Sequence, residues 1–267
     1  MCVLANVWTL IVTYFFGVLT TPLVQLLPGS LMAEARRRWE ARAATRRIIA
    51  TQLDPLLKAA DELQGKIRSL AEEDFREFRA IPPGLLQKAD LVNLCSTLYL
   101  FAQLWARLEI LRKESVHADL NRNGRGKVLM RFLRCLESRR VRLVDRAWQR
   151  AIGESVIEQA KPLSDVRTFK AFVEEYEETP RLQEWVHPLE DVIRQTKFPR
   201  TRQRVLQYGV IVQALIDTLD PKHYTTRARP AYPNKLSRRA KREMIGRVFE
   251  TYLPDVRHTE KYTGISR

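Results

Sequence analysis

The sequence has few cysteines and histidines, and this scarcity excludes several kinds of site. Its 267 residues include three cysteines, at positions 2, 95 and 135, and four histidines. Three scattered cysteines cannot build a disulfide framework, and none forms a Cys-x-x-Cys pair. This pattern suits a reducing compartment such as the cytoplasm. Cys95 lies among apolar residues, which predicts a buried structural thiol rather than a reactive one.

Catalytic motifs are also scarce, and the one candidate metal site consists of two Glu-x-x-His motifs. Glu114 with His117 and Glu184 with His187 match the Glu-x-x-His spacing of carboxylate-bridged di-iron bundles, because residues i and i+3 share a helical face. The further carboxylates would come from Glu62 or Glu73 and from Glu137 or Glu154. Both motifs fall off the apolar faces of their helices. We therefore predict no metal, no cofactor and no catalytic residue.

Charge is absent from the first 33 residues, which indicates a membrane anchor. Residues 3–21 form an apolar run of 19 residues that Pro22 closes. At about 1.5 Å of rise per residue, such a helix spans the ~30 Å hydrocarbon core of a bilayer. A cleaved signal peptide fits less well, because the positive n-region is missing and the run is long. A buried core helix is the other alternative to a transmembrane anchor over residues 1–29.

A cluster of arginines follows this run and predicts its orientation. Residues 34–47 contain Arg36, Arg37, Arg38, Arg42, Arg46 and Arg47. Short flanks rich in arginine stay in the cytoplasm, so we expect the N-terminus outside and the bulk of the chain in the cytoplasm. The same arginines are candidates for contact with the anionic inner leaflet.

Apolar residues then recur at alternating steps of four and three over residues 49–70. This heptad spacing predicts that residues 30–80 form a basic juxtamembrane helix, with a coiled-coil pattern, or a helical hairpin. Asp54-Pro55 either starts a new helix or kinks a continuous one. The stripe would dock on the rest of the chain, or bind another protein or a second copy.

An uncharged stretch over residues 91–106 predicts the central helix of an irregular helical bundle over residues 85–221. It is short for a membrane span, although a second transmembrane or re-entrant segment is the alternative. Its buried face should carry Leu94, Leu98, Phe101, Trp105, Leu108 and Arg112. No run of alternating strands appears, so the predicted fold class is all-α.

Four further helices are predicted over residues 129–150, 164–178, 180–193 and 201–219. In the first, Arg139, Arg142, Arg146 and Arg150 recur at steps of three and four, so they share one face. That face is either solvated or grips lipid headgroups, phosphate or an acidic partner. In the third, Trp185 is expected to point inward.

The last segment, residues 222–267, is predicted to be a basic tail. Residues 222–235 read as a linker that is disordered or is ordered by a partner. Ser237 then caps a basic helix whose apolar stripe ends near Tyr252. This helix would dock on its own domain or lie on an anionic membrane. The residues predicted to contact such a surface are Arg238, Arg239, Lys241 and Arg242.

Three segments are similar to an uncharacterised group of membrane-anchored helical proteins. They are LYLFAQLWARLEILRKE at residues 98–114, QRAIGE at residues 149–154 and ALIDTLDP at residues 214–221. The resemblance implies a helical domain over residues 85–221 and no particular activity.

The net charge of +15 calls for an anionic partner or surface. Beside a membrane anchor, anionic lipid is the nearest candidate. We therefore predict a membrane-tethered helical scaffold or interaction module. A metal-dependent helical-bundle enzyme is one alternative. A membrane-held nucleic-acid-binding protein is another, although nucleic acid is a less expected partner because no recognised binding fold is visible.

Overall fold

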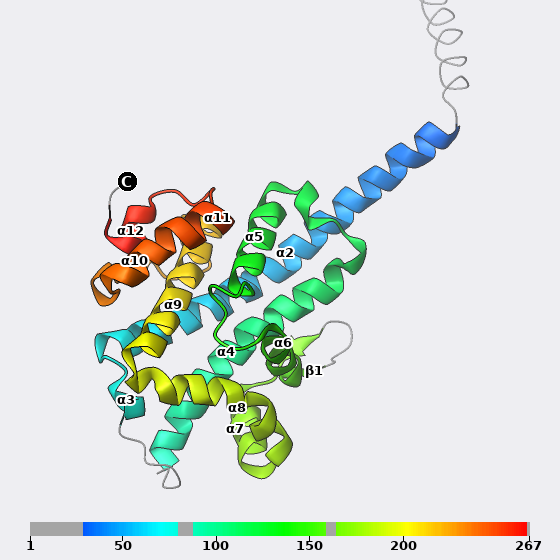
Figure 1. The fold of residues 1–267 in the computed structure, drawn as a ribbon. Helices are drawn as coiled ribbons and strands as arrows, with labels where there is room; N and C mark the ends of the chain where they lie inside the picture. The colour runs from blue at the N-terminus through cyan, green and yellow to red at the C-terminus, as the bar shows by residue number, and fades with distance from the viewer. Residues whose placement is uncertain (1–28, 80–87, 159–163, 266–267) are drawn as a thin grey trace, which may run out of the picture. The chain divides into compact units, whose positions relative to one another are not determined.

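The computed structural model describes residues 29–79, 88–158 and 164–265 (Figure 1). Most of these residues are helical, which confirms the all-α fold class. The chain divides into two compact units, Met1–Ala44 and Thr45–Arg267. The predicted transmembrane helix over residues 3–21 lies outside the described residues. Within the described ranges, no helix is both long and apolar enough to cross a membrane.

The heptad stripe lies on α2 (Gly29–Glu72), one helix of 44 residues with Pro55 inside it. The predicted alternative of a helical hairpin is therefore wrong. The apolar residues of the stripe are buried by other helices of the same unit: Ile49, Leu53, Leu56, Ala60, Leu63, Ile67 and Leu70. Of the two predicted roles, docking on the rest of the chain accounts for this burial. Binding of another protein or a second copy through the same stripe stays a prediction.

The chain turns sharply where α2 ends. Asp74 and Phe75 have left-handed backbones, with φ of 51° and 58°. The Phe75 amide donates to the Leu70 carbonyl over 2.7 Å, and the Phe75 ring is fully buried. Burial of the ring compensates for the unusual backbone conformation and directs the chain into α3 (Arg76–Arg79).

The central helix of the bundle is α4 (Lys88–Glu114), as the sequence predicts. The five apolar residues of its predicted buried face are all buried: Leu94, Leu98, Phe101, Trp105 and Leu108. Trp105 donates from its indole Nε1 to the hydroxyl of Tyr208 over 2.8 Å. Arg112 is only partly buried, and it pairs with Glu109 and Glu137. Because α4 lies within the core, the alternative of a second transmembrane segment is wrong.

The predicted helix over residues 129–150 is two helices, α5 (Gly124–Leu136) and α6 (Arg146–Ser155). The loop of residues 137–145 separates them. Asp145 caps α6 by accepting from the Ala147 amide over 3.1 Å. The arginines of the predicted strip are therefore divided between this loop and α6, and the prediction that they share one helical face is wrong.

Short elements join these helices to the rest. Two 3₁₀ turns, η1 (Ser115–His117) and η2 (Leu120–Arg122), precede α5. After α6, β1 (Ile157–Glu158) pairs antiparallel with β2 (Asp165–Val166), Ile157 opposite Val166.

Three helices follow and complete the bundle: α7 (Phe169–Glu178), α8 (Pro180–Arg194) and α9 (Pro199–Leu219), with the 3₁₀ turn η3 (Gln195–Lys197) before α9. Thr168, not Ser164, caps α7. Pro180 begins α8 as predicted, but Trp185 is 38% exposed and packs edge-on against Trp148 with ring centres 5.5 Å apart. The prediction that Trp185 points inward is wrong.

Residues 222–235 are ordered on the bundle, so the linker prediction is wrong. Asp220 accepts hydrogen bonds from the amides of Tyr224, Thr225 and Thr226 over 2.9–3.0 Å. Arg229 then pairs with Asp61 of α2 through two bonds of 2.9 and 3.2 Å. These contacts place the segment in the same compact unit as the bundle.

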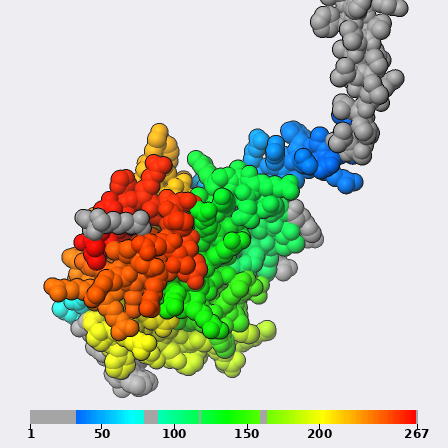
Figure 2. All heavy atoms as spheres, turned by 45° about the horizontal axis from the view of Figure 1, so that its top comes forward, coloured from blue at the N-terminus to red at the C-terminus, as the bar shows by residue number. Residues whose placement is uncertain are grey.

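The end of the chain also folds onto this unit. It contains the 3₁₀ turn η4 (Pro233–Lys235), α10 (Arg238–Met244), the π-helical η5 (Ile245–Phe249), α11 (Glu250–Tyr252) and α12 (Thr259–Thr263). Met244, Val248 and Phe249 are buried in the core. The apolar stripe therefore docks on its own domain, and its predicted insertion into a membrane is wrong. In Figure 2 this segment, in orange and red, lies against the yellow and green segments.

Candidate anion-binding pocket

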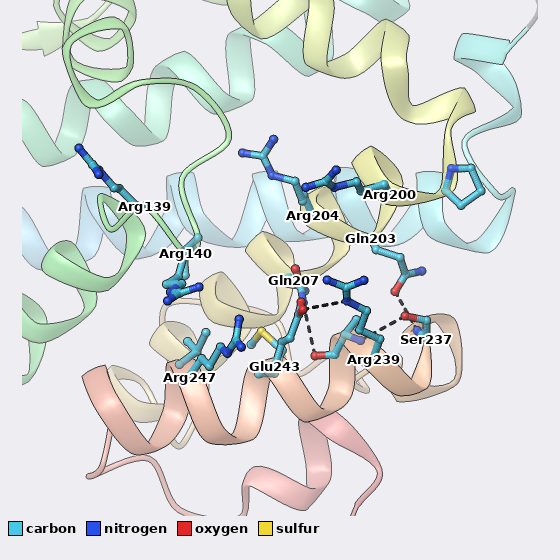
Figure 3. Close-up of a pocket in the computed structure, with 15 residues that line it drawn as sticks. Arg139, Arg140, Arg200, Gln203, Arg204, Gln207, Ser237, Arg239, Glu243 and Arg247 are labelled. Atoms are coloured by element: carbon cyan, nitrogen blue, oxygen red, sulfur yellow. Dashed lines mark hydrogen bonds and ion pairs between the residues drawn. The ribbon is translucent and has the colours of Figure 1, made fainter.

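An open pocket with a volume of about 520 Å³ lies where three elements meet (Figure 3). They are the loop of residues 137–145, the first half of α9, and α10 with η5. Its lining contains six arginines: Arg139, Arg140, Arg200, Arg204, Arg239 and Arg247. Glu243 is the one acidic residue among the lining residues. The pocket is therefore strongly positive.

The α9 wall follows from the helical period. Pro199 begins the helix, and Arg200, Gln203, Arg204 and Gln207 recur at steps that keep them on one side. Val205, which lies among these positions, and Tyr208, which follows them, are buried in the core. The apolar side of α9 therefore orients its polar side toward the pocket.

Two glutamines of α9 hold the segment of α10 in place. Gln203 donates to the Lys235 carbonyl over 3.0 Å and accepts from the Ser237 amide over 2.8 Å. Gln207 donates to the Ala240 carbonyl over 3.3 Å. Ser237 also caps α10 by accepting from the Ala240 amide. Both glutamine side chains are therefore engaged in hydrogen bonds within the protein, and their role is to position the pocket wall. The arginines are the groups that give the pocket its positive charge.

Arg204 holds the third wall of the pocket, the loop of residues 137–145, in place. Its guanidinium donates to the backbone carbonyls of Arg142 over 2.7 Å and Leu143 over 3.3 Å. Partial withdrawal from water, and then the charge of Arg200, lower the pKa of Arg204. The loop of residues 137–145 is thereby tied to α9, which keeps Arg139 and Arg140 at the pocket.

The pocket's positive charge is compensated at one point. Arg239 pairs with Glu243 over 3.0 Å, and this hydrogen bond lowers the pKa of Glu243. Among the described residues, the other five guanidinium groups form no ion pair within 4 Å, although the charge of Arg247 also contributes to lowering the pKa of Glu243. Figure 3 shows Arg140 and Arg247 pointing into the space between the loop and η5, whereas Arg139 extends away from the others. The arrangement suits an anion, because guanidinium groups bind carboxylate and phosphate through paired hydrogen bonds.

The arginines that the sequence singled out are mostly elsewhere. Of α10, Arg239 lines the pocket, whereas Arg238 and Arg242 are exposed and Lys241 is half-buried. The six arginines between residues 36 and 47 are exposed on α2. Two of them form pairs within the helix, Arg36 with Glu40 and Arg38 with Glu34.

Most arginines of the predicted strip pair with carboxylates within the protein. Arg142 pairs with Asp145, and Arg146 pairs with Glu137 over 3.0 Å. Arg150 lies 3.8 Å from Glu109. Arg139 is the member of the strip that lines the pocket. The sequence reasoning missed Arg140, Arg200, Arg204 and Arg247, although the spacing of the polar residues on α9 is a signal that could have pointed to that wall.

The Glu-x-x-His motifs do not form a metal site in the described part of the chain. Glu114 accepts from the Gln52 side chain over 2.8 Å. His187 lies 3.5 Å from Asp191 on the same helix. The side chain of His117 lies outside what the structure describes. Across the ranges described, no group of three or more histidine, cysteine or carboxylate side chains could hold a metal ion.

The two described thiols are unsuited to nucleophilic chemistry. Cys95 and Cys135 are fully buried, which confirms the predicted burial of Cys95. Burial raises the pKa of each thiol to about 12. Because the thiolate is the nucleophile, both side chains stay protonated and inert near neutral pH.

Comparison with known proteins adds no relative from which a function could be carried over. No family model matches the chain, and no curated protein or solved structure matches it significantly. The resemblance of the three segments described above therefore stays a prediction.

Proposed function

We propose that this chain is a membrane-tethered helical binding module that contacts anionic lipid at a membrane surface. The observation that carries the proposal is the arrangement of α10. Its apolar side is buried in its own domain, and Arg238 and Arg242 remain exposed beside a pocket lined by six arginines. An anchor in residues 1–29, with the N-terminus outside, would hold this surface near the cytoplasmic leaflet.

Electrostatics supply the binding energy. Each lysine or arginine near an anionic leaflet contributes about 1 kcal/mol at low screening. The effect fades within a Debye length of about 8 Å at physiological salt, so only residues close to the surface count. Arg238 and Arg242 are both exposed on one short helix, so a leaflet that approaches this helix would come close to both.

An exposed aromatic residue at the pocket favours lipid over an acidic protein. Phe198 is 55% exposed and directly precedes Pro199, which lines the pocket. The ammonium of Lys197 lies 5.3 Å from the centre of its ring. Apolar rings with adjacent cations are typical of residues that sit at the boundary between headgroups and acyl chains. The pocket, Phe198 and α10 would then meet the membrane together.

Vesicle binding tests the proposal. A fragment of residues 34–267 retains the whole core of the unit Thr45–Arg267, so we expect it to fold without the anchor. It should sediment with vesicles that contain ~30% anionic lipid and not with neutral vesicles, because the attraction is electrostatic. The variant changes three basic residues of α10 to glutamine: Arg238, Lys241 and Arg242. Its affinity should fall about tenfold or more, since each charge contributes about 1 kcal/mol.

A matched control removes the same charge elsewhere. It changes three exposed basic residues away from α10 to glutamine: Arg125, Lys127 and Arg181. This variant should bind almost as tightly as the unmodified fragment. Equal binding to neutral and anionic vesicles, or an equal loss in both variants, would show that the basic residues of α10 serve another purpose.

A further inference from the structure

The arginines of the pocket divide into two groups by what they bind within the protein. Arg204 donates to two backbone carbonyls and Arg239 pairs with Glu243, so both have structural partners. The other four form no ion pair within 4 Å and no hydrogen bond through their guanidinium groups in the described chain, although the charge of Arg247 contributes to lowering the pKa of Glu243. Of these four, Arg139 extends away from the others (Figure 3), which leaves Arg140, Arg200 and Arg247. An exposed arginine without partners is ordinary by itself. Three of them, from three different elements around one hollow, form a site.

The size and the charge of the pocket together restrict the kind of ligand that it can bind. A volume of about 520 Å³ lies within the ~300–1,000 Å³ that small-molecule sites occupy, and it exceeds what a single phosphate ion needs. A ligand with one negative charge would neutralise only one of the three free guanidinium groups. A ligand with two or more phosphates can present oxygens to several of them, each through paired hydrogen bonds.

The pocket is formed before any ligand arrives. Gln203 and Gln207 fasten α10, and Arg204 fastens the loop that carries Arg140. The three walls are therefore held by contacts that a ligand would not have to create. Preorganisation of this kind reduces the entropic cost of binding.

We infer that this pocket binds a compact group carrying two or more phosphates, with Arg140, Arg200 and Arg247 as its contacts and Arg204 as a positioning residue. The inference rests on the proposed function for its setting at a membrane, but its chemistry stands on the pocket alone. The group is either the headgroup of a polyphosphorylated lipid or a free polyphosphate, and the two sources present the same oxygens.

Calorimetric titration of the full chain in detergent with inorganic phosphate, pyrophosphate and tripolyphosphate tests the chemistry. Affinity should increase with the number of phosphates, at one ligand per chain. Tripolyphosphate at about 100 times its dissociation constant should raise the melting temperature by about 5–10 °C, because a ligand stabilises the state it binds. Equal affinity for phosphate and tripolyphosphate, or the absence of binding, would overturn the inference. So would a poly-glutamate peptide that binds as tightly as tripolyphosphate.

A triple variant with Arg140, Arg200 and Arg247 changed to glutamine tests the residues. It should bind tripolyphosphate at least tenfold more weakly, while its melting temperature without ligand stays the same or rises, since unpaired like charges have been removed. The control is the variant of Arg125, Lys127 and Arg181, which loses the same charge and should bind as the unmodified chain does. An equal loss of affinity in both variants would overturn the assignment to the pocket.

Vesicle binding distinguishes a lipid headgroup from a free polyphosphate as the ligand. It also tests the pocket separately from the proposed contact of α10 with anionic lipid. With the fragment of residues 34–267, the pocket variant should lose the extra affinity for vesicles with a bisphosphorylated inositol lipid over vesicles of equal charge made with phosphatidylserine. Loss of that preference supports a lipid headgroup. Binding of soluble tripolyphosphate without any such preference supports a free ligand. Binding to phosphatidylserine vesicles should depend on α10 and not on the pocket, so it reports on the proposed function separately.

Discussion

Changing Trp105 to alanine should destabilise the unit Thr45–Arg267 by at least about 4 kcal/mol. The side chain is 1% exposed, and its loss from a packed core costs about 3–5 kcal/mol. The change also removes the indole donor of Tyr208, whose hydroxyl is buried and would lose its 2.8 Å bond. An unsatisfied buried hydroxyl adds about 1–3 kcal/mol. Since small domains are stable by about 5–15 kcal/mol, this single change removes much of the total.

A double-mutant cycle separates the hydrogen bond from the packing. Trp105→Phe leaves the Tyr208 hydroxyl unpaired, and Tyr208→Phe leaves the indole N–H unpaired. The double variant leaves neither group, so its destabilisation should be less than the sum of the two single changes by about 1–2 kcal/mol. Urea unfolding of the fragment of residues 45–267, followed by circular dichroism, measures each free energy.

Trp148→Ala is the matched control, because the same change is made at a tryptophan that is 38% exposed. It should cost less than about 1.5 kcal/mol, most of it from the contact with Trp185. If Trp105→Ala costs no more than this control, the core does not lie along α4. If the two phenylalanine changes add within about 0.3 kcal/mol, the hydrogen bond between the side chains contributes nothing.

Three further predictions concern the same unit. Gly153→Ala should lower stability by about 1–3 kcal/mol in urea unfolding, because its Cβ would lie 2.7 Å from a backbone atom of α4, whereas Gly124→Ala, with open space around it, should be neutral or stabilising; equal effects would contradict the close helix contact. Cys95 and Cys135 should react with a thiol reagent only after unfolding, since burial raises both pKa values to about 12, and fast labelling of the folded fragment would refute this. Asp220→Asn should cost about 1–3 kcal/mol at pH 7, because hydrogen bonds lower the pKa of this carboxyl although its burial opposes ionisation. The contribution is present above the unfolded pKa of about 4 and is lost as pH falls through the lower folded pKa, so a cost that persists in acid would contradict it.

Elements with a local signal could be predicted from the amino-acid sequence. The apolar spacing along residues 91–108 predicted the buried face of α4, and the Thr179-Pro180 pair predicted the start of α8. The heptad spacing on α2 likewise identified a stripe that is buried. These predictions succeeded because helical periodicity and capping depend on residues within one or two turns of each other.

The same local signals gave wrong predictions for segments whose structure depends on contacts with residues far away in the sequence. The helical spacing of the arginines continues through residues 137–145, but these residues form a loop. The next helix, α6, begins after Asp145, which caps it. Residues 222–235 look like a linker by composition, yet Arg229 is fixed by Asp61, which lies far away in the sequence. A partner of this kind cannot be read from a window of neighbouring residues.

The pocket was decided by tertiary structure alone. Arg140 lies in a loop, Arg200 on α9 and Arg247 on η5, and no spacing in the sequence relates them. They meet because α9 buries its apolar side and because Gln203 and Arg204 then hold α10 and the loop against its polar side. Local spacing therefore determined which side of each helix is buried, whereas long-range packing determined which charged residues face each other.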